Sequence, residues 1–214
     1  MEIQLSNISL AYTGTLLDNP TPLILNLGKN YIITSPSGTG KSTLIHLIYG
    51  LVRDYEGDYT LNNKETRTLT IEEWSQLRTS VLSIVFQGFR LIMESTVLEN
   101  IVLKNKLTSH VNLDEIEFYA SQLNIETLLN KKVSELSFGQ QQRIAILRSL
   151  CQPFKWLLLD EPFAHLDREN MQKALTLLTE KAQQNGAGII ISDTKTNLML
   201  SNFIPIQLNT LNNG

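Results

Sequence analysis

Apolar and polar residues alternate along the first segment of the chain, with apolar residues at Ile3, Leu5, Ile8 and Leu10. A period of two predicts a strand with one face in water, which is typical of antiparallel sheets. The segment "DNPTPLI" at residues 18–24 predicts a turn. The polar residues 57–70 predict a hairpin.

Longer apolar runs predict buried strands at residues 30–35, 81–86, 156–161 and 188–192. Helical periodicity predicts a helix from about Lys41 to Gly50 and another at about 168–184. Leu113, Ile116, Ala120 and Leu123 have helical spacing within a helix-rich insert at about 88–154. Strands that alternate with helices predict an α/β fold with a mostly parallel sheet.

The composition narrows the class of protein. The 214 residues are 42% hydrophobic and 18% charged, as expected for a globular domain and not for a disordered chain. The net charge of −3 gives no basic surface for broad nucleic-acid or anionic-lipid binding. Cys151 is the single cysteine, which excludes an intrachain disulfide. No window reaches the roughly 20 apolar residues of a membrane span. We therefore expect a soluble cytoplasmic protein without direct membrane insertion, bound to the membrane face through a partner.

The segment "SPSGTGKST" at residues 35–43 lies between a predicted strand and a predicted helix. In that context Gly38 and Gly40 allow the backbone N–H groups to form a concave site for phosphate oxygens. Lys41 can reach the β- and γ-phosphates, and Ser42 can ligate Mg²⁺. The usual first glycine of this motif is Ser35, which predicts a slightly strained or differently turned loop. The predicted nucleotide-binding residues are Ser35, Pro36, Ser37, Gly38, Thr39, Gly40, Lys41, Ser42 and Thr43.

Two adjacent carboxylates follow the apolar strand in "WLLLDEPFAHLD" at residues 156–167. Acids at the edge of a core are costly unless something compensates their charge. We expect Asp160 to hold Mg²⁺ through water opposite Ser42, and Glu161 to act as the general base toward the attacking water. His46 and His110 lack metal-ligating companions in the sequence and are expected to be ordinary surface or rim residues.

The segment "LSFGQQQR" at residues 136–143, together with the phosphate loop and the acidic strand, resembles the ATP-binding cassette (ABC) ATPases along almost the whole chain. The resemblance implies one domain, 1–214, with ATP and Mg²⁺ as cofactors. It implies a P-loop NTPase (RecA-like) core with an antiparallel β subdomain at about 1–87 and 155–214, and a helical signature subdomain at about 88–154. Ser137, Gly139 and Gln140 would then face the ATP of a partner cassette, and Phe138 stands where the family has a glycine.

The same resemblance assigns roles to other residues. Gln87 in "VFQGFRL" is similar to the glutamine that contacts Mg²⁺ and the attacking water. Asp167 is similar to the acid that contacts the partner across the dimer. Tyr12 has the spacing of the residue that stacks on adenine, although a tyrosine that ends a strand can equally be a core or rim residue. Residues 88–100 are similar to the surface that receives a permease. The slightly longer segment 86–100 most resembles the lipoprotein-release, macrolide-export and cell-division cassettes.

The strand "GIIIS" should be followed by a histidine in this family, but the chain has Asp193. An ionised aspartate repels the γ-phosphate, whereas a histidine donates a hydrogen bond to it. Two hypotheses therefore stay open. The chain is the ATP-hydrolysing subunit of a homo- or heterodimer that drives an integral membrane permease, or a degenerate cassette that binds ATP with little hydrolysis of its own. A DNA- or ribosome-acting cassette is disfavoured, because the acidic chain has no basic extension.

Overall fold

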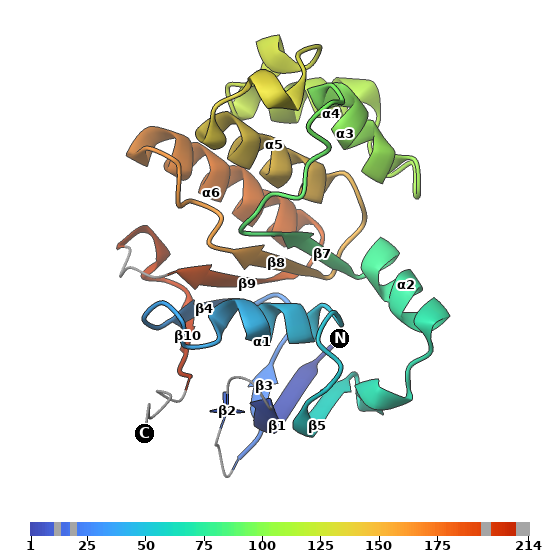
Figure 1. Cartoon of the computed structure of the whole chain (residues 1–214), viewed down its shortest axis with the longest axis vertical. Helices are drawn as coiled ribbons and strands as arrows, with labels where there is room; N and C mark the ends of the chain where they lie inside the picture. Colours follow the sequence, from blue (N-terminus) through green and yellow to red (C-terminus); the bar gives the residue numbers. More distant parts are fainter. Residues whose placement is uncertain (11–13, 18–20, 194–197, 209–214) are drawn as a thin grey trace.

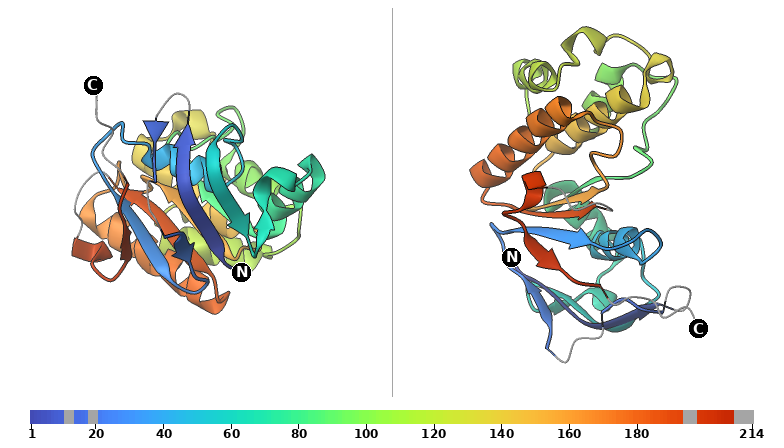
Figure 2. Two further views of the ribbon diagram at one scale, coloured as in Figure 1. Left: turned by 90° about the horizontal axis from the view of Figure 1, so that it is seen from below. Right: turned by 90° about the vertical axis from the view of Figure 1, so that its left-hand side faces the viewer.

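The computed structural model describes residues 1–10, 14–17, 21–193 and 198–208. The elements form layers (Figure 1). A group of helices lies at one end, a parallel sheet crosses the middle, helix α1 (Lys41–Ile48) lies beneath it, and an antiparallel sheet closes the other end. The side view in Figure 2 shows the same order.

The central sheet has five parallel strands in the order β10-β4-β9-β8-β7. These strands are β4 (Asn30–Thr34), β7 (Leu82–Val85), β8 (Trp156–Asp160), β9 (Gly188–Asp193) and β10 (Ile204–Ile206). All five residues of β8 are buried, as are the first five of β9. The predicted parallel sheet with both faces covered is therefore confirmed.

The second sheet is antiparallel and is centred on β1 (Ile3–Leu10), whose apolar positions are buried as the alternation predicted. Its other strands are β2 (Gly14–Thr15), β3 (Leu23–Leu25), β5 (Glu56–Leu61) and β6 (Lys64–Glu65). The predicted hairpin corresponds to β5 and β6. The predicted turn was wrong at its end, because Leu23 and Ile24 pair with β1.

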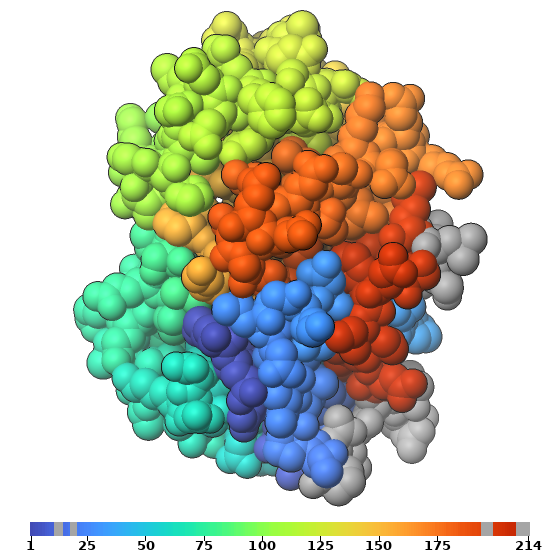
Figure 3. Space-filling view, turned by 180° about the vertical axis from the view of Figure 1, so that it is seen from behind, coloured from blue at the N-terminus to red at the C-terminus, as the bar shows by residue number. Residues whose placement is uncertain are grey.

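The remaining helices are α2 (Ile71–Ser80), α3 (Val97–Asn105), α4 (Leu113–Gln122), α5 (Phe138–Leu150) and α6 (Arg168–Gln184). Short 3₁₀ helices occupy Thr66–Thr68, Glu126–Leu128, Val133–Glu135 and Leu198–Leu200. Helices α3, α4 and α5 lie together at the helical end, within the predicted insert (Figure 1). The space-filling view from behind shows α6 between this end and the rest of the molecule (Figure 3).

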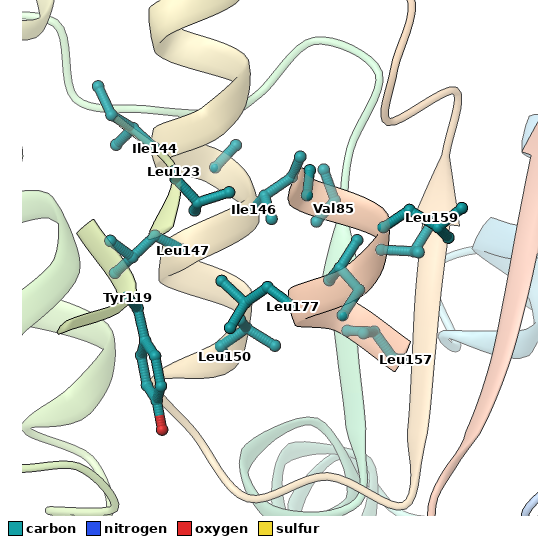
Figure 4. Close-up of a cluster of buried hydrophobic side chains, with 14 of the residues drawn as sticks. Val85, Tyr119, Leu123, Ile144, Ile146, Leu147, Leu150, Leu157, Leu159 and Leu177 are labelled. Carbon is teal, nitrogen blue, oxygen red and sulfur yellow. The ribbon is translucent and has the colours of Figure 1, made fainter. Parts of the chain in front are cut away.

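Two hydrophobic clusters sandwich the parallel sheet. Leu157 and Leu159 of β8 face the cluster shared with α3 to α6, whereas Trp156 and Leu158 face the cluster shared with α1 and the antiparallel sheet. Figure 4 shows side chains of α5 and α6 meeting β7 and β8. The insert therefore shares a core with the sheet. Leu113 is an exception to its predicted apolar face, since it is 61% exposed.

Among the described residues, no helix combines the length and apolar character that a membrane span requires.

Candidate functional site

The phosphate loop follows β4 and leads into α1. Gly38 and Gly40 have φ of 81° and 94°, the left-handed conformation that glycine adopts without strain. A Cβ on Gly40 would lie 2.2 Å from Leu16 Cδ2, so the loop also needs a glycine there for space. Ser35 does not have a positive φ, so the strain expected at this position is not found. Ser35, which replaces the usual first glycine, therefore does not need a left-handed conformation, whereas Gly38 and Gly40 have it.

Lys41 is 4% exposed and closes over this loop. Its Nζ donates to the carbonyl oxygens of Ser35, at 2.6 Å, and Pro36, at 2.8 Å. Thr39 Oγ1 donates to the same Pro36 carbonyl at 2.8 Å, whereas Ser37 is exposed and Thr43 partly buried. The lysine ammonium is thus held at the loop where phosphate oxygens would bind.

Asp160, the last residue of β8, is hydrogen-bonded to α1 and to β9. It is 1% exposed, and its Oδ1 accepts from Ser42 Oγ at 2.9 Å and from Ser192 Oγ at 2.8 Å. The structure therefore brings together two of the three residues predicted to contact Mg²⁺, Ser42 and Asp160; Gln87, the third, contacts Glu161 instead. Ser192 was not predicted: it is fully buried on β9, and its role depends on a register between β8 and β9 that the sequence alone does not give.

Glu161 begins the loop after β8. Its backbone N–H donates to Ser192 Oγ at 3.0 Å, and its φ is 46°, an uncommon conformation for a residue with a side chain. Gln87 Nε2 donates to Glu161 Oε2 at 3.2 Å. The two predicted catalytic side chains are therefore in contact, and Ser192 connects the backbone of one to the carboxylate of Asp160.

His46 is partly exposed, as expected for a rim residue, and it also lies beside the acidic strand. Its Nε2 is 3.7 Å from Asp160 Oδ2, one turn of α1 beyond Ser42. Burial lowers the pKa of His46 more than Asp160 raises it. The imidazole is consequently neutral at pH 7, and the contact is not an ion pair at that pH. The spacing of four residues from Ser42 to His46 was the available sequence signal.

The segment that resembles the family signature forms the N-terminus of α5. Ser137 is its N-cap, as predicted, and exchanges two hydrogen bonds with Gln140 in a capping box. Gln142, which was not predicted, connects this helix to the loop that begins at Glu161. Its side chain donates to the carbonyl of Glu161 at 3.0 Å and accepts from the N–H of His165 at 2.9 Å. The signature residues are thus fixed relative to Glu161.

Gly139 packs against the same loop, because a Cβ there would meet the His165 carbonyl at 2.8 Å. Asp167 is the exposed N-cap of α6, and the hydrogen bonds from Asn170 lower the pKa of its carboxyl. Arg143 donates to Gly139 O at 3.2 Å and to Asn170 Oδ1 at 3.2 Å. This places Asp167 next to the signature helix, and its contact with a partner stays a prediction.

Two predictions concern the remaining strand ends. Asp193 ends β9 and is paired in register with Thr34, directly before the phosphate loop. This is the edge where the family histidine was expected. Tyr12, predicted to contact adenine, lies outside the described residues.

The donor set fits Mg²⁺. Asp160 Oδ2 is a buried carboxylate oxygen without a hydrogen-bond partner in the described part of the chain, and Ser42 Oγ lies next to this carboxylate. An oxygen-only set of one carboxylate and one hydroxyl suits a hard cation that keeps several water ligands.

Comparisons with known proteins agree with this arrangement. A family model described as "ABC transporter" matches residues 19–164. The methionine import ATP-binding protein MetN 1 of Bacillus cereus is 33% identical over 204 residues, which are 92% of this chain and 59% of that protein. The lipoprotein-releasing system ATP-binding protein LolD of Buchnera aphidicola is 32% identical over 81% of this chain and 78% of its own. The macrolide export ATP-binding/permease protein MacB of Pasteurella multocida is 30% identical, and the match covers 89% of this chain and 30% of that protein.

Solved structures are similar over almost the whole chain. A dimeric bacterial ABC transporter cassette has a TM-score of 0.83 and 29% identity, with 96% of this chain and 94% of that chain covered. A dimeric cassette in a post-hydrolysis state, bound to ADP and Pi, has a TM-score of 0.78 and 28% identity, with 97% and 94% covered. The predicted fold class is confirmed, and the predicted similarity to lipoprotein-release and macrolide-export cassettes agrees with two of these relatives.

Proposed function

Because this chain belongs to the ABC transporter family, as one of its ATP-binding cassettes, we propose that it binds ATP in its phosphate loop and hydrolyses it to drive a separate membrane permease. The observation that carries the proposal is the 2.9 Å hydrogen bond from Ser42 to Asp160, which joins the end of the phosphate loop to the acidic strand. Such a junction is the site for a nucleotide and its metal in P-loop NTPases.

Different residues of this chain have different roles in the proposed reaction. The backbone N–H groups of residues 37–43 and the ammonium of Lys41 bind the phosphates. Ser42 and Asp160 would hold Mg²⁺, which neutralises phosphate charge when bound. Glu161 accepts the proton of the attacking water, and Gln87 positions the Glu161 carboxylate through their 3.2 Å contact. The site thus supplies binding, orientation and a base.

The second half of the ATP site would come from another cassette. Ser137, Gly139 and Gln140 lie at the start of α5, outside the cluster of Ser42, Asp160 and Glu161. Support for a dimer comes from the similar dimeric structures. In the proposed assembly these residues approach the partner's γ-phosphate, Asp167 contacts the partner, and Tyr12 stacks on adenine. Residues 88–100 receive the permease at the cytoplasmic face of the membrane.

Asp193 favours a second candidate function, an ATP-binding cassette with little hydrolysis of its own. Its strand position beside Thr34 brings an acidic side chain to the edge that carries the phosphate loop. A carboxylate there disfavours the charge that accumulates on the transferred phosphoryl group. Such a cassette could still present Ser137 and Gly139 to a competent partner.

The test is ATP affinity and turnover of purified protein. Lys41→Ala should weaken ATP binding by at least about a hundredfold, because it removes the buried ammonium that the loop holds. Lys131→Ala, an exposed change in the helical end, serves as the control. Equal affinity of both variants would contradict the proposed nucleotide site. ATP binding with negligible turnover, alone or beside a partner cassette, would favour the second candidate.

A further inference from the structure

Three aromatic side chains meet at the junction of the signature helix with two loops. Phe138, the first residue of α5, stacks on His165 with ring centroids 5.6 Å apart and an interplanar angle of 30°. Phe89 contacts both rings, at 5.8 Å from His165 and 6.4 Å from Phe138. We call Phe89, His165 and Phe138 the aromatic platform. It brings together the loop after Gln87, the loop after Glu161 and the start of α5.

The platform is anchored on one side and open on the other. Phe89 is only 7% exposed, and Arg148 donates to its carbonyl oxygen at 2.7 Å. His165 is held by the bond from its N–H to Gln142. Phe138, in contrast, is 67% exposed, and His165 beneath it is also exposed. A large apolar ring is therefore held in water by neighbours that are themselves fixed.

Folding of this chain does not need that ring. The core of α5 is made by Ile144, Ala145, Ile146, Leu147 and Leu150, which are at most 2% exposed. The helix is capped by Ser137 and Gln140 whatever residue stands between them. The ring of Phe138 buries little within the chain, so most of its apolar surface remains to be buried against something else.

The surface around Phe138 indicates the occupant. Its neighbours Ser137 and Gly139 are the residues proposed above to face a second cassette, and the first turn of α5 contains no acidic residue. We propose that Phe138, supported by His165, is an apolar anchor that packs against a second copy of this chain when two cassettes close on ATP. The inference rests on the proposed function. Beyond that function, we infer that burial of the Phe138 ring stabilises the dimer, in addition to the ATP that the two cassettes share.

The dimer dissociation constant measures this contribution. Sedimentation experiments with Mg²⁺ and ATP would use protein carrying Glu161→Gln, which removes the proposed base and slows hydrolysis. Full burial of one phenyl ring changes an equilibrium constant roughly tenfold to hundredfold. Phe138→Ala should therefore weaken the dimer at least about tenfold, and Phe138→Tyr, which keeps the ring, should stay within about threefold.

Phe118 provides a matched control, because it is 57% exposed on α4 and its ring contacts a neighbouring aromatic, Tyr119. Phe118→Ala should leave the dimer unchanged. If Phe138→Ala dimerises as the parent does, or if both alanine variants are equally weak, the anchor is wrong. A parent that binds ATP but stays monomeric excludes the second copy as the occupant. A parent that does not bind ATP overturns the proposed function itself, and circular dichroism of each variant checks that it is folded.

Discussion

Ser192→Ala removes the hydroxyl that is hydrogen-bonded to both Asp160 and Glu161 at the end of β8. Ser192 Oγ donates to Asp160 Oδ1 at 2.8 Å and accepts from the Glu161 N–H at 3.0 Å, and the residue is fully buried. In the variant the Glu161 N–H lacks its acceptor, and Asp160 Oδ1 keeps only Ser42 as a donor. Glu161 also has a left-handed backbone, with φ of 46°, that this bond helps to hold.

The size of the effect follows from these contacts. An unsatisfied buried N–H costs about 1–3 kcal/mol, and a hydrogen bond to a charged group contributes about 1.5–3 kcal/mol. Because the two losses share one atom and are not additive, we expect the free energy of unfolding to fall by about 2–4 kcal/mol. Turnover should fall by roughly tenfold to a hundredfold, since both the proposed metal-binding carboxylate of Asp160 and the proposed base Glu161 lose a fixed position. ATP affinity should change less, because the phosphate loop is untouched.

Urea unfolding followed by circular dichroism measures the first quantity, and a coupled ATPase assay the second. Ser83→Ala is the control, because Ser83 is equally buried but donates only to the Ser149 carbonyl, at 2.6 Å, away from the site. It should cost about 1 kcal/mol and leave turnover intact. If Ser192→Ala is no more costly than Ser83→Ala, or hydrolyses ATP at the parent rate, the assignment of Ser192 is refuted.

Three further predictions use other sites. Asp193→His should raise turnover at least about tenfold if the chain's own site is catalytic, and Asp193→Asn separates loss of charge from gain of a donor; no gain in either, with normal ATP affinity, would contradict the role of Asp193. Burial raises the pKa of the Cys151 thiol to about 12, so at pH 8 only about 0.01% is thiolate, and thiol reagents should label it only after denaturant is added. Gly40→Ala should lower the melting temperature and weaken ATP binding, because of its φ of 94° and the contact with Leu16. Gly88→Ala, in open space, should not change the melting temperature.

The sequence was most informative where a single segment carried the signal. The apolar runs at residues 156–161 and 188–192 predict buried parallel strands. The structure agrees, because successive residues of β8 and β9 pack into the two hydrophobic clusters on opposite faces of the sheet. Helix α2 was missed because its apolar pattern is weak: Ile71 is 68% exposed and Trp74 is its one buried residue among those described. Thr70 and Glu73 form a capping box at its start, which was the signal that could have located it.

Contacts between distant segments were the harder part of the site. The phosphate loop, Asp160 and Glu161 could be selected from their own motifs, and Gln87 from the resemblance to the family. The link through Ser192 could not, because it requires Asp160 to lie opposite Ser192 in the register of β8 and β9. Gln142 is similar: its two bonds to the loop that begins at Glu161 depend on how α5 packs against β7 and α6. Such residues are ordinary buried polar side chains until the tertiary structure supplies their partners.

The end of β9 therefore combines two neighbouring residues with separable effects. Side chains alternate along a strand, and Ile191 faces the helical cluster while Ile190 faces the cluster of α1. The same alternation directs Ser192 toward α1, in agreement with its bond to Asp160, and starts Asp193 on the other face. Ser192 then acts on the geometry of Asp160 and Glu161, whereas Asp193 acts through its charge. The Ser192→Ala and Asp193→His changes should accordingly affect different quantities: the first lowers both stability and turnover, and the second changes turnover with little effect on unfolding. A loss of stability in Asp193→His comparable to that of Ser192→Ala would show that the two residues form one structural unit and would contradict this separation.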